Sequence, residues 1–74
     1  MEELTPRERD VVRLLAGGLS NSEIALELGV SYATVRNHLT SVYDKAGLRS
    51  RIEVAVWALQ VGIVRLDEIE LRRI

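Results

Sequence analysis

The chain has 74 residues and a formal net charge of −1, and it contains no cysteine and one histidine. This composition excludes disulfides and thiolate metal sites, leaves no cluster for a metal or cofactor, and argues against a general polyanion binder. The 47% share of hydrophobic residues suits one small all-α domain over residues 1–74, a size at which self-association can add stability.

The first predicted helix follows Thr5 and ends at the Gly17-Gly18 pair. Thr5 and Glu8 have the spacing of a capping box, in which each side chain bonds a backbone N–H at the helix start, and Pro6 suits the first helical position. The apolar residues that recur at helical spacing behind this cap are Val11, Leu14 and Leu15.

A short second helix and a longer third helix are predicted next. Ser20 and Glu23 form a second capping box, Gly29 ends the short helix, and Ser31 caps the longer one, which runs to Ala46 before Gly47. The expected core positions of the two helices are Ile24, Ala25, Leu28, Val35, Leu39, Val42 and Ala46. A short capped helix, a tight turn and a longer capped helix are typical of a helix-turn-helix, whose second helix enters the major groove of DNA.

The third helix has a polar face opposite its apolar stripe, at about 100° per residue. Arg pairs with guanine and Asn with adenine, Thr bonds a base or touches a thymine methyl, and Ala can only do the last. The predicted base contacts are therefore Arg36, Asn37, Thr40 and Ala33.

Phosphate contacts are predicted on the flank of this helix, just past it, and at the start of the second helix, where free amides and the helix dipole favour anions. Residues 31–52 carry four basic residues and one acidic residue on an otherwise acidic chain. The predicted phosphate contacts are Ser20, Asn21, Thr34, His38, Lys45, Arg49 and Arg51. For His38, a half-buried packing role is an equal alternative.

The fourth predicted helix begins at a third capping box, Ser50 and Glu53, and runs to about Val61 before Gly62. It has two apolar stripes. We expect the stripe of Ile52, Ala55, Ala58 and Leu59 to pack on the domain, and the stripe of Val54, Trp57 and Val61 to form an exposed dimer interface. Trp57 in the core is the alternative. In residues 63–74, Leu66, Ile69 and Ile74 allow a further amphipathic turn or a frayed tail.

Four motifs, in this order, resemble the LuxR-type helix-turn-helix of bacterial transcription regulators, which include the NarL/FixJ response regulators. They are Leu4-Thr5-Pro6-Arg7-Glu8-Arg9, Ser20-Asn21-Ser22-Glu23-Ile24-Ala25, Thr34-Val35-Arg36-Asn37-His38-Leu39 and Lys45-Ala46-Gly47-Leu48. The resemblance covers about residues 4–62, which leaves 63–74 as a C-terminal tail.

The resemblance implies a four-helix domain that binds double-stranded DNA as a homodimer through its fourth helix. It implies base contacts at Arg36, Asn37 and Thr40, although family members often have Lys at the first of these positions and a basic residue at the last. It also implies a receiver or ligand-binding domain N-terminal to this one, so the chain is either the output domain of a response regulator or a stand-alone regulator.

Other function classes remain open at this point. A helix-turn-helix that has become a protein-interaction module fits the acidic composition, and a sigma-factor-like segment would share the first three helices, although the fourth argues against it. An enzyme is not expected, because no nucleophile with a base, carboxylate pair in an apolar cleft or phosphate-binding loop is evident. No apolar run approaches the roughly 20 residues of a membrane span and no signal peptide is evident, so we expect a cytoplasmic protein without membrane partners.

Overall fold

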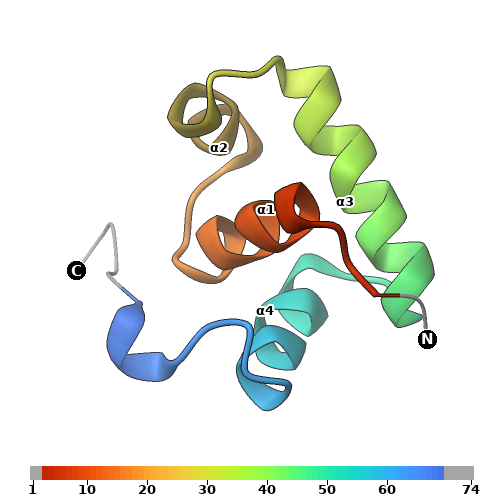
Figure 1. Ribbon diagram of the computed structural model, residues 1–74, viewed down its shortest axis with the longest axis vertical. Coiled ribbons are helices and arrows are strands. Elements are labelled where there is room, and N and C mark those ends of the chain that lie inside the picture. Colours follow the sequence, from red (N-terminus) through yellow and green to blue (C-terminus); the bar gives the residue numbers. More distant parts are fainter. Residues whose placement is uncertain (1–2, 70–74) are drawn as a thin grey trace.

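The computed structural model describes residues 3–69, and within that range all regular structure is helical (Figure 1). The elements are α1 Pro6–Ala16, α2 Asn21–Leu28, α3 Tyr32–Ala46, α4 Arg51–Gln60 and a short 3-10 helix η1 Leu66–Glu68. The prediction of an all-α fold with four α-helices is confirmed. None of these helices is long and apolar enough to cross a membrane.

Two of the three predicted capping boxes form as expected. Thr5 Oγ1 accepts from the N–H of Glu8 at 3.1 Å, and Glu8 Oε1 accepts from the N–H of Thr5 at 2.9 Å. Ser20 and Glu23 pair in the same way at 3.2 and 2.8 Å. At the start of α4, the Glu53 carboxylate accepts instead from the N–H of Arg49 at 2.8 Å, so the third box is only half formed.

The hydrophobic core lies where α1 packs against α3 and α4, while α2 packs mainly on α3 (Figure 1). The predicted stripe of α3 faces this core, because Val35, Leu39 and Val42 are buried. Among residues 3–69, the buried hydrophobic residues of the core are Leu4, Val11, Val12, Leu15, Leu19, Ile24, Ala25, Val35, Leu39, Val42, Val54, Ala58, Ile63 and Val64.

The inward and outward faces of α4 differ from the prediction. Ala58 is fully buried and Ala55 half-buried, as expected, but Val54 is also fully buried, whereas Ile52 is 77% exposed and Leu59 37% exposed. The chain turns at Gly62, with φ of +82°, so that the N–H of Ile63 donates to the carbonyl of Ala58 at 2.9 Å. This turn brings the side chains of Ile63 and Val64 into the core, beside Val54 and Ala58.

The core therefore extends beyond residue 62, into the segment that was predicted to be a C-terminal tail. Ile63 and Val64 are buried, η1 follows, and Ile69 is half-buried against the cluster. An amphipathic turn at Leu66 to Ile69 fits one of the two alternatives for the tail, although Leu66 itself is 74% exposed. Ile74 lies outside the described residues.

Candidate nucleic-acid interface

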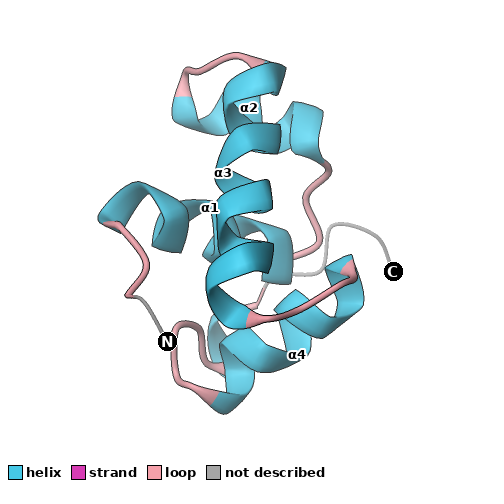
Figure 2. Cartoon of the chain, turned by 90° about the vertical axis from the view of Figure 1, so that its right-hand side faces the viewer, coloured by secondary structure: helices cyan, strands magenta, loops and turns pink. Residues whose placement is uncertain are grey.

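The turn between α2 and α3 has the geometry of a helix-turn-helix. Gly29 ends α2 in the left-handed conformation, with φ of +70° and ψ of +33°, and the N–H of Val30 donates to the carbonyl of Ala25 at 3.0 Å. Ser31 then caps α3, because its Oγ accepts from the N–H of Thr34 at 3.1 Å. The turn fixes the direction of α3 relative to α2, and Figure 2 shows α3 along the front of the domain.

The outward face of α3 carries the four predicted base-contacting residues. Ala33, Arg36, Asn37 and Thr40 are all exposed. Thr40 Oγ1 donates to the carbonyl of Arg36 at 3.0 Å, which leaves its oxygen lone pairs available. Within residues 3–69, neither Arg36 nor Asn37 uses its side chain in a hydrogen bond or ion pair with another residue. The arrangement thus offers a guanidinium, an amide, a hydroxyl and a methyl group along one helix face.

The predicted phosphate contacts on the flank of α3 differ in what they touch. Thr34 is half-buried and shares a hydrogen bond with the cap, its Oγ1 lying 2.9 Å from Ser31 Oγ. His38 is half-buried, which is compatible with both of its predicted roles. Arg49, beyond the end of the helix, is exposed.

Lys45 is engaged inside the domain. Its Nζ lies 2.8 Å from Glu8 Oε1 and 3.3 Å from the carbonyl of Glu3, and the Lys45 and Glu8 side chains are only 17% and 6% exposed. Burial raises the pKa of the Glu8 carboxyl, but hydrogen bonds from Lys45, the Thr5 N–H and Ser41, together with the lysine charge, outweigh it and lower the pKa to about 2. This ammonium group is therefore held toward α1 and not toward the outward face of α3.

At the start of α2, Ser20 and Asn21 were predicted to bind phosphate together with the first backbone amides of the helix. Ser20 is exposed and Asn21 is half-buried. The guanidinium of Arg51 donates to Asn21 Oδ1 and to the carbonyl of Leu19, each at 2.7 Å. Arg51, which was predicted to bind phosphate, is thus used in an internal link.

The surface of α4 does not present the predicted stripe. Val54 is fully buried, so its assignment to a dimer interface is wrong. Trp57 is half-buried and packs against the core, and Val61 is 51% exposed beyond the end of the helix. The exposed apolar row consists instead of Ile52, Val56 and Leu59, spaced by four and three residues along one face. Sequence reasoning missed Val56, although its position four residues after Ile52 was a usable signal.

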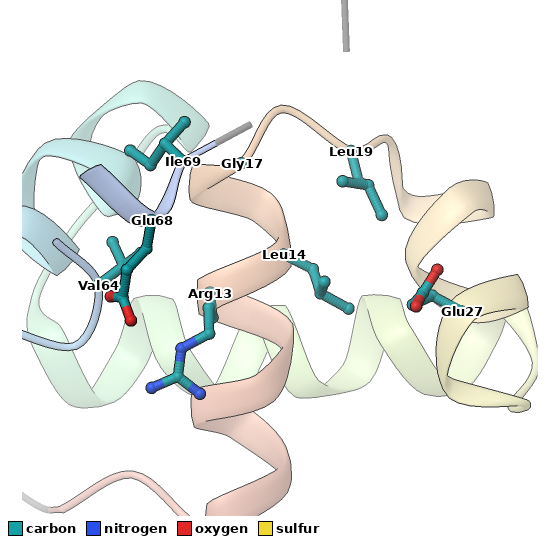
Figure 3. Close-up of a pocket in the computed structure, with 8 residues that line it drawn as sticks. All are labelled: Arg13, Leu14, Gly17, Leu19, Glu27, Val64, Glu68 and Ile69. Carbon is teal, nitrogen blue, oxygen red and sulfur yellow. The ribbon is translucent and has the colours of Figure 1, made fainter. Parts of the chain in front are cut away.

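A hollow of about 260 Å³ lies between α1, α2 and the segment after α4 (Figure 3). Its lining combines apolar side chains with three charged ones: Leu14, Leu19, Val64, Ile69, Arg13, Glu27 and Glu68, beside Gly17. The guanidinium of Arg13 donates to the carbonyl of Ile63 at 3.0 Å. None of the lining residues comes from α3, so this hollow is separate from the exposed polar face of that helix.

A comparison with protein families matches residues 2–58 to the family described as bacterial regulatory proteins, luxR family. A relative described as an HTH-type transcriptional regulator of Mycobacterium bovis is 56% identical over 59 residues, which are 80% of this chain and 7% of that protein. The nitrate/nitrite response regulator protein NarL of Escherichia coli K12 is 45% identical over 63 residues, 85% of this chain and 29% of NarL.

Among solved structures, the response regulator ChrA of a heme-sensing two-component system superposes with a TM-score of 0.80 at 34% identity. The match covers 86% of this chain and 32% of ChrA. The chain therefore spans about a third or less of the length of these relatives.

Proposed function

Because this chain belongs to the luxR family of bacterial regulatory proteins, whose helix-turn-helix is a DNA-binding domain and not an enzyme, we propose that it binds specific DNA sequences as a homodimer and thereby regulates transcription. The observation that carries the proposal is the exposed face of α3, where Arg36, Asn37 and Thr40 lie side by side on the second helix of the helix-turn-helix.

In this proposal α3 enters the major groove and its outward face contacts base edges. Arg36 donates two hydrogen bonds to a guanine, Asn37 pairs with an adenine, and Thr40 and Ala33 contact further bases or a thymine methyl. Phosphates are bound by exposed or half-exposed groups around this helix. They are Ser20, Asn21, Thr34, His38 and Arg49. Lys45 and Arg51 are left out of this set because both are engaged within the domain.

The homodimer is proposed to form through α4. Three large apolar side chains exposed in one row, Ile52, Val56 and Leu59, are costly to leave in water and suit a two-fold contact between identical helices. Trp57 is half-buried and Val61 lies just beyond the end of α4, and a contribution from them stays a prediction. Pairing would place two copies of α3 on half-sites about one DNA turn apart.

We further propose that the chain acts as the output domain of a two-component response regulator in the cytoplasm, where the bacterial chromosome lies. Two observations support this: NarL and ChrA are response regulators, and the matched segment is less than a third of each. A receiver domain is accordingly the proposed partner in the same protein.

The proposal is tested by incubating the protein with a pool of random duplexes at two salt concentrations and sequencing the bound fraction. We expect enrichment of a two-fold-related site and an affinity that falls steeply with salt, because phosphate contacts release counterions. Absence of both enrichment and salt-dependent binding would contradict DNA recognition and favour a protein-interaction module.

A further inference from the structure

Arg51, the first residue of α4, joins that helix to the start of α2. Its Nη2 donates to the carbonyl of Leu19 and its Nη1 donates to Asn21 Oδ1, both at 2.7 Å, across 32 and 30 positions of sequence. Few other contacts connect α2 with α4, since α2 packs chiefly on α3. The half-buried guanidinium is therefore a principal link between the two helices.

The same contact fixes the orientation of the Asn21 amide. A guanidinium has only donors, so Asn21 must turn its oxygen toward Arg51 and its Nδ2 group away from it. Asn21 is the first residue of α2, where backbone N–H groups lack helical partners. Ser20 satisfies the N–H of Glu23 through its side chain and that of Ile24 through its carbonyl. Asn21 thus lies at the helix end that is proposed to bind a DNA phosphate.

We propose that Arg51 is a positioning residue for DNA binding, which holds the amide of Asn21 in the orientation that bonds a phosphate. The inference rests on the proposed function and adds to it a residue that acts through another one. A direct phosphate contact by Arg51 is disfavoured because two of its donors are already used in short internal hydrogen bonds.

The test is a double-mutant cycle on the full chain, with the variants Arg51→Gln, Asn21→Ala and their combination, together with Arg51→Lys. Dissociation constants are measured on the selected operator and on a shuffled duplex at several salt concentrations, and thermal melting by circular dichroism checks folding. The matched control is Arg65→Gln, which removes the same charge from a 73% exposed side chain at the start of η1. In Figure 1 this short helix, drawn in blue, lies on the other side of the domain from α3.

We expect Arg51→Gln and Asn21→Ala each to weaken binding to both duplexes alike, by about fivefold to tenfold, with little change in the salt slope, because the proposed phosphate contact is made by a neutral amide. In the Asn21→Ala background, Arg51→Gln should add less than about a twofold loss, because the group through which it acts is gone. Arg51→Lys should behave like Arg51→Gln, since an ammonium does not reproduce the two-pronged guanidinium. Arg65→Gln should change the affinity by less than about twofold, because its charge is exposed, distant and screened.

An equal loss from Arg51→Gln in both backgrounds, or full affinity in Arg51→Lys, would overturn the proposal in favour of a direct charge contact. A lower melting temperature with unchanged affinity in Arg51→Gln would reduce Arg51 to a structural residue, and a salt slope lowered by about one would identify it as a direct phosphate contact. If Arg51→Gln does not fold, Asn21→Ala and Arg51→Lys still decide. A wild-type protein without salt-dependent DNA binding would instead contradict the proposed function.

Discussion

Lys45, in the last turn of α3, and Glu8, in the first turn of α1, form a largely buried ion pair with Nζ 2.8 Å from Oε1. The same carboxylate oxygen accepts from the N–H of Thr5 at 2.9 Å, so one side chain both caps α1 and holds α3 against it. Since α3 is the proposed recognition helix, this pair fixes its C-terminal end relative to the rest of the domain.

The stability of the domain should depend on pH through Glu8. Its pKa is about 2 in the folded chain against an ordinary 4.5, because the Lys45 and Thr5 contacts outweigh the opposing effect of burial. A lowered folded-state pKa means that the stabilisation is complete above about pH 4.5 and is lost as the pH falls toward 2, where the unfolded chain binds the proton more readily. The loss should amount to about 3 kcal/mol, measured by urea unfolding across this range.

The control for this prediction is Glu8→Gln, which keeps the shape of the side chain but not its charge. It should be less stable than the wild type at pH 7 and about equally stable near pH 2. A gap between the two proteins that stays constant from pH 7 to pH 2 would show that another carboxylate carries the acid sensitivity.

Local sequence signals predicted most of the fold, because each acts over a few residues. These signals depend only on spacing along one helix. They are the capping boxes at Thr5 and Ser20, the helix ends at glycine residues, and the apolar stripe of Val35, Leu39 and Val42. The same spacing placed Arg36 and Asn37 on the exposed face of α3.

Long-range pairing was not predictable in this way. The partners of Lys45 and Arg51 lie 37 and 30 residues away, so their internal contacts leave no local signal. The two apolar stripes of α4 were of similar strength, and the choice between them is decided by the turn at Gly62, which brings Ile63 and Val64 into the core. As a result Val54 lies in the core, while Ile52 and Leu59 are exposed.

Arg36 should contribute to base specificity. Arg36→Ala removes an exposed guanidinium that makes no hydrogen bond or ion pair with the other described residues, so folding should be unaffected while binding to the selected operator weakens by about 1–3 kcal/mol. Preference should relax at one base pair per half-site, which is measured by titrating duplexes with single substitutions. Equal weakening on every sequence would instead identify Arg36 as a phosphate contact.

Val56, at the centre of the exposed row on α4, should control dimer formation. Val56→Lys places a charge in the proposed two-fold contact and should shift the protein toward monomer in analytical ultracentrifugation, with weaker binding to the two-fold operator. Affinity for a single half-site should be retained. The matched change Leu26→Lys affects an equally apolar side chain that is 85% exposed on α2, and should leave the dimer intact. A dimer unaffected by Val56→Lys would exclude the row as the contact.

Gly29 should stabilise the turn before α3, because this position requires a left-handed backbone conformation. Its φ of +70° is costly for a residue with a Cβ, yet a Cβ added there meets nothing within 4 Å, so Gly29→Ala should cost only the backbone term of about 1–2 kcal/mol. Gly29→Asn should cost less, because Asn tolerates the left-handed region better. The control is Gly17→Ala, at the end of α1, where φ is −78° and the change brings no such strain. Urea unfolding of the three variants checks the order, and a loss in Gly17→Ala as large as in Gly29→Ala would show that the φ angle is not the cause.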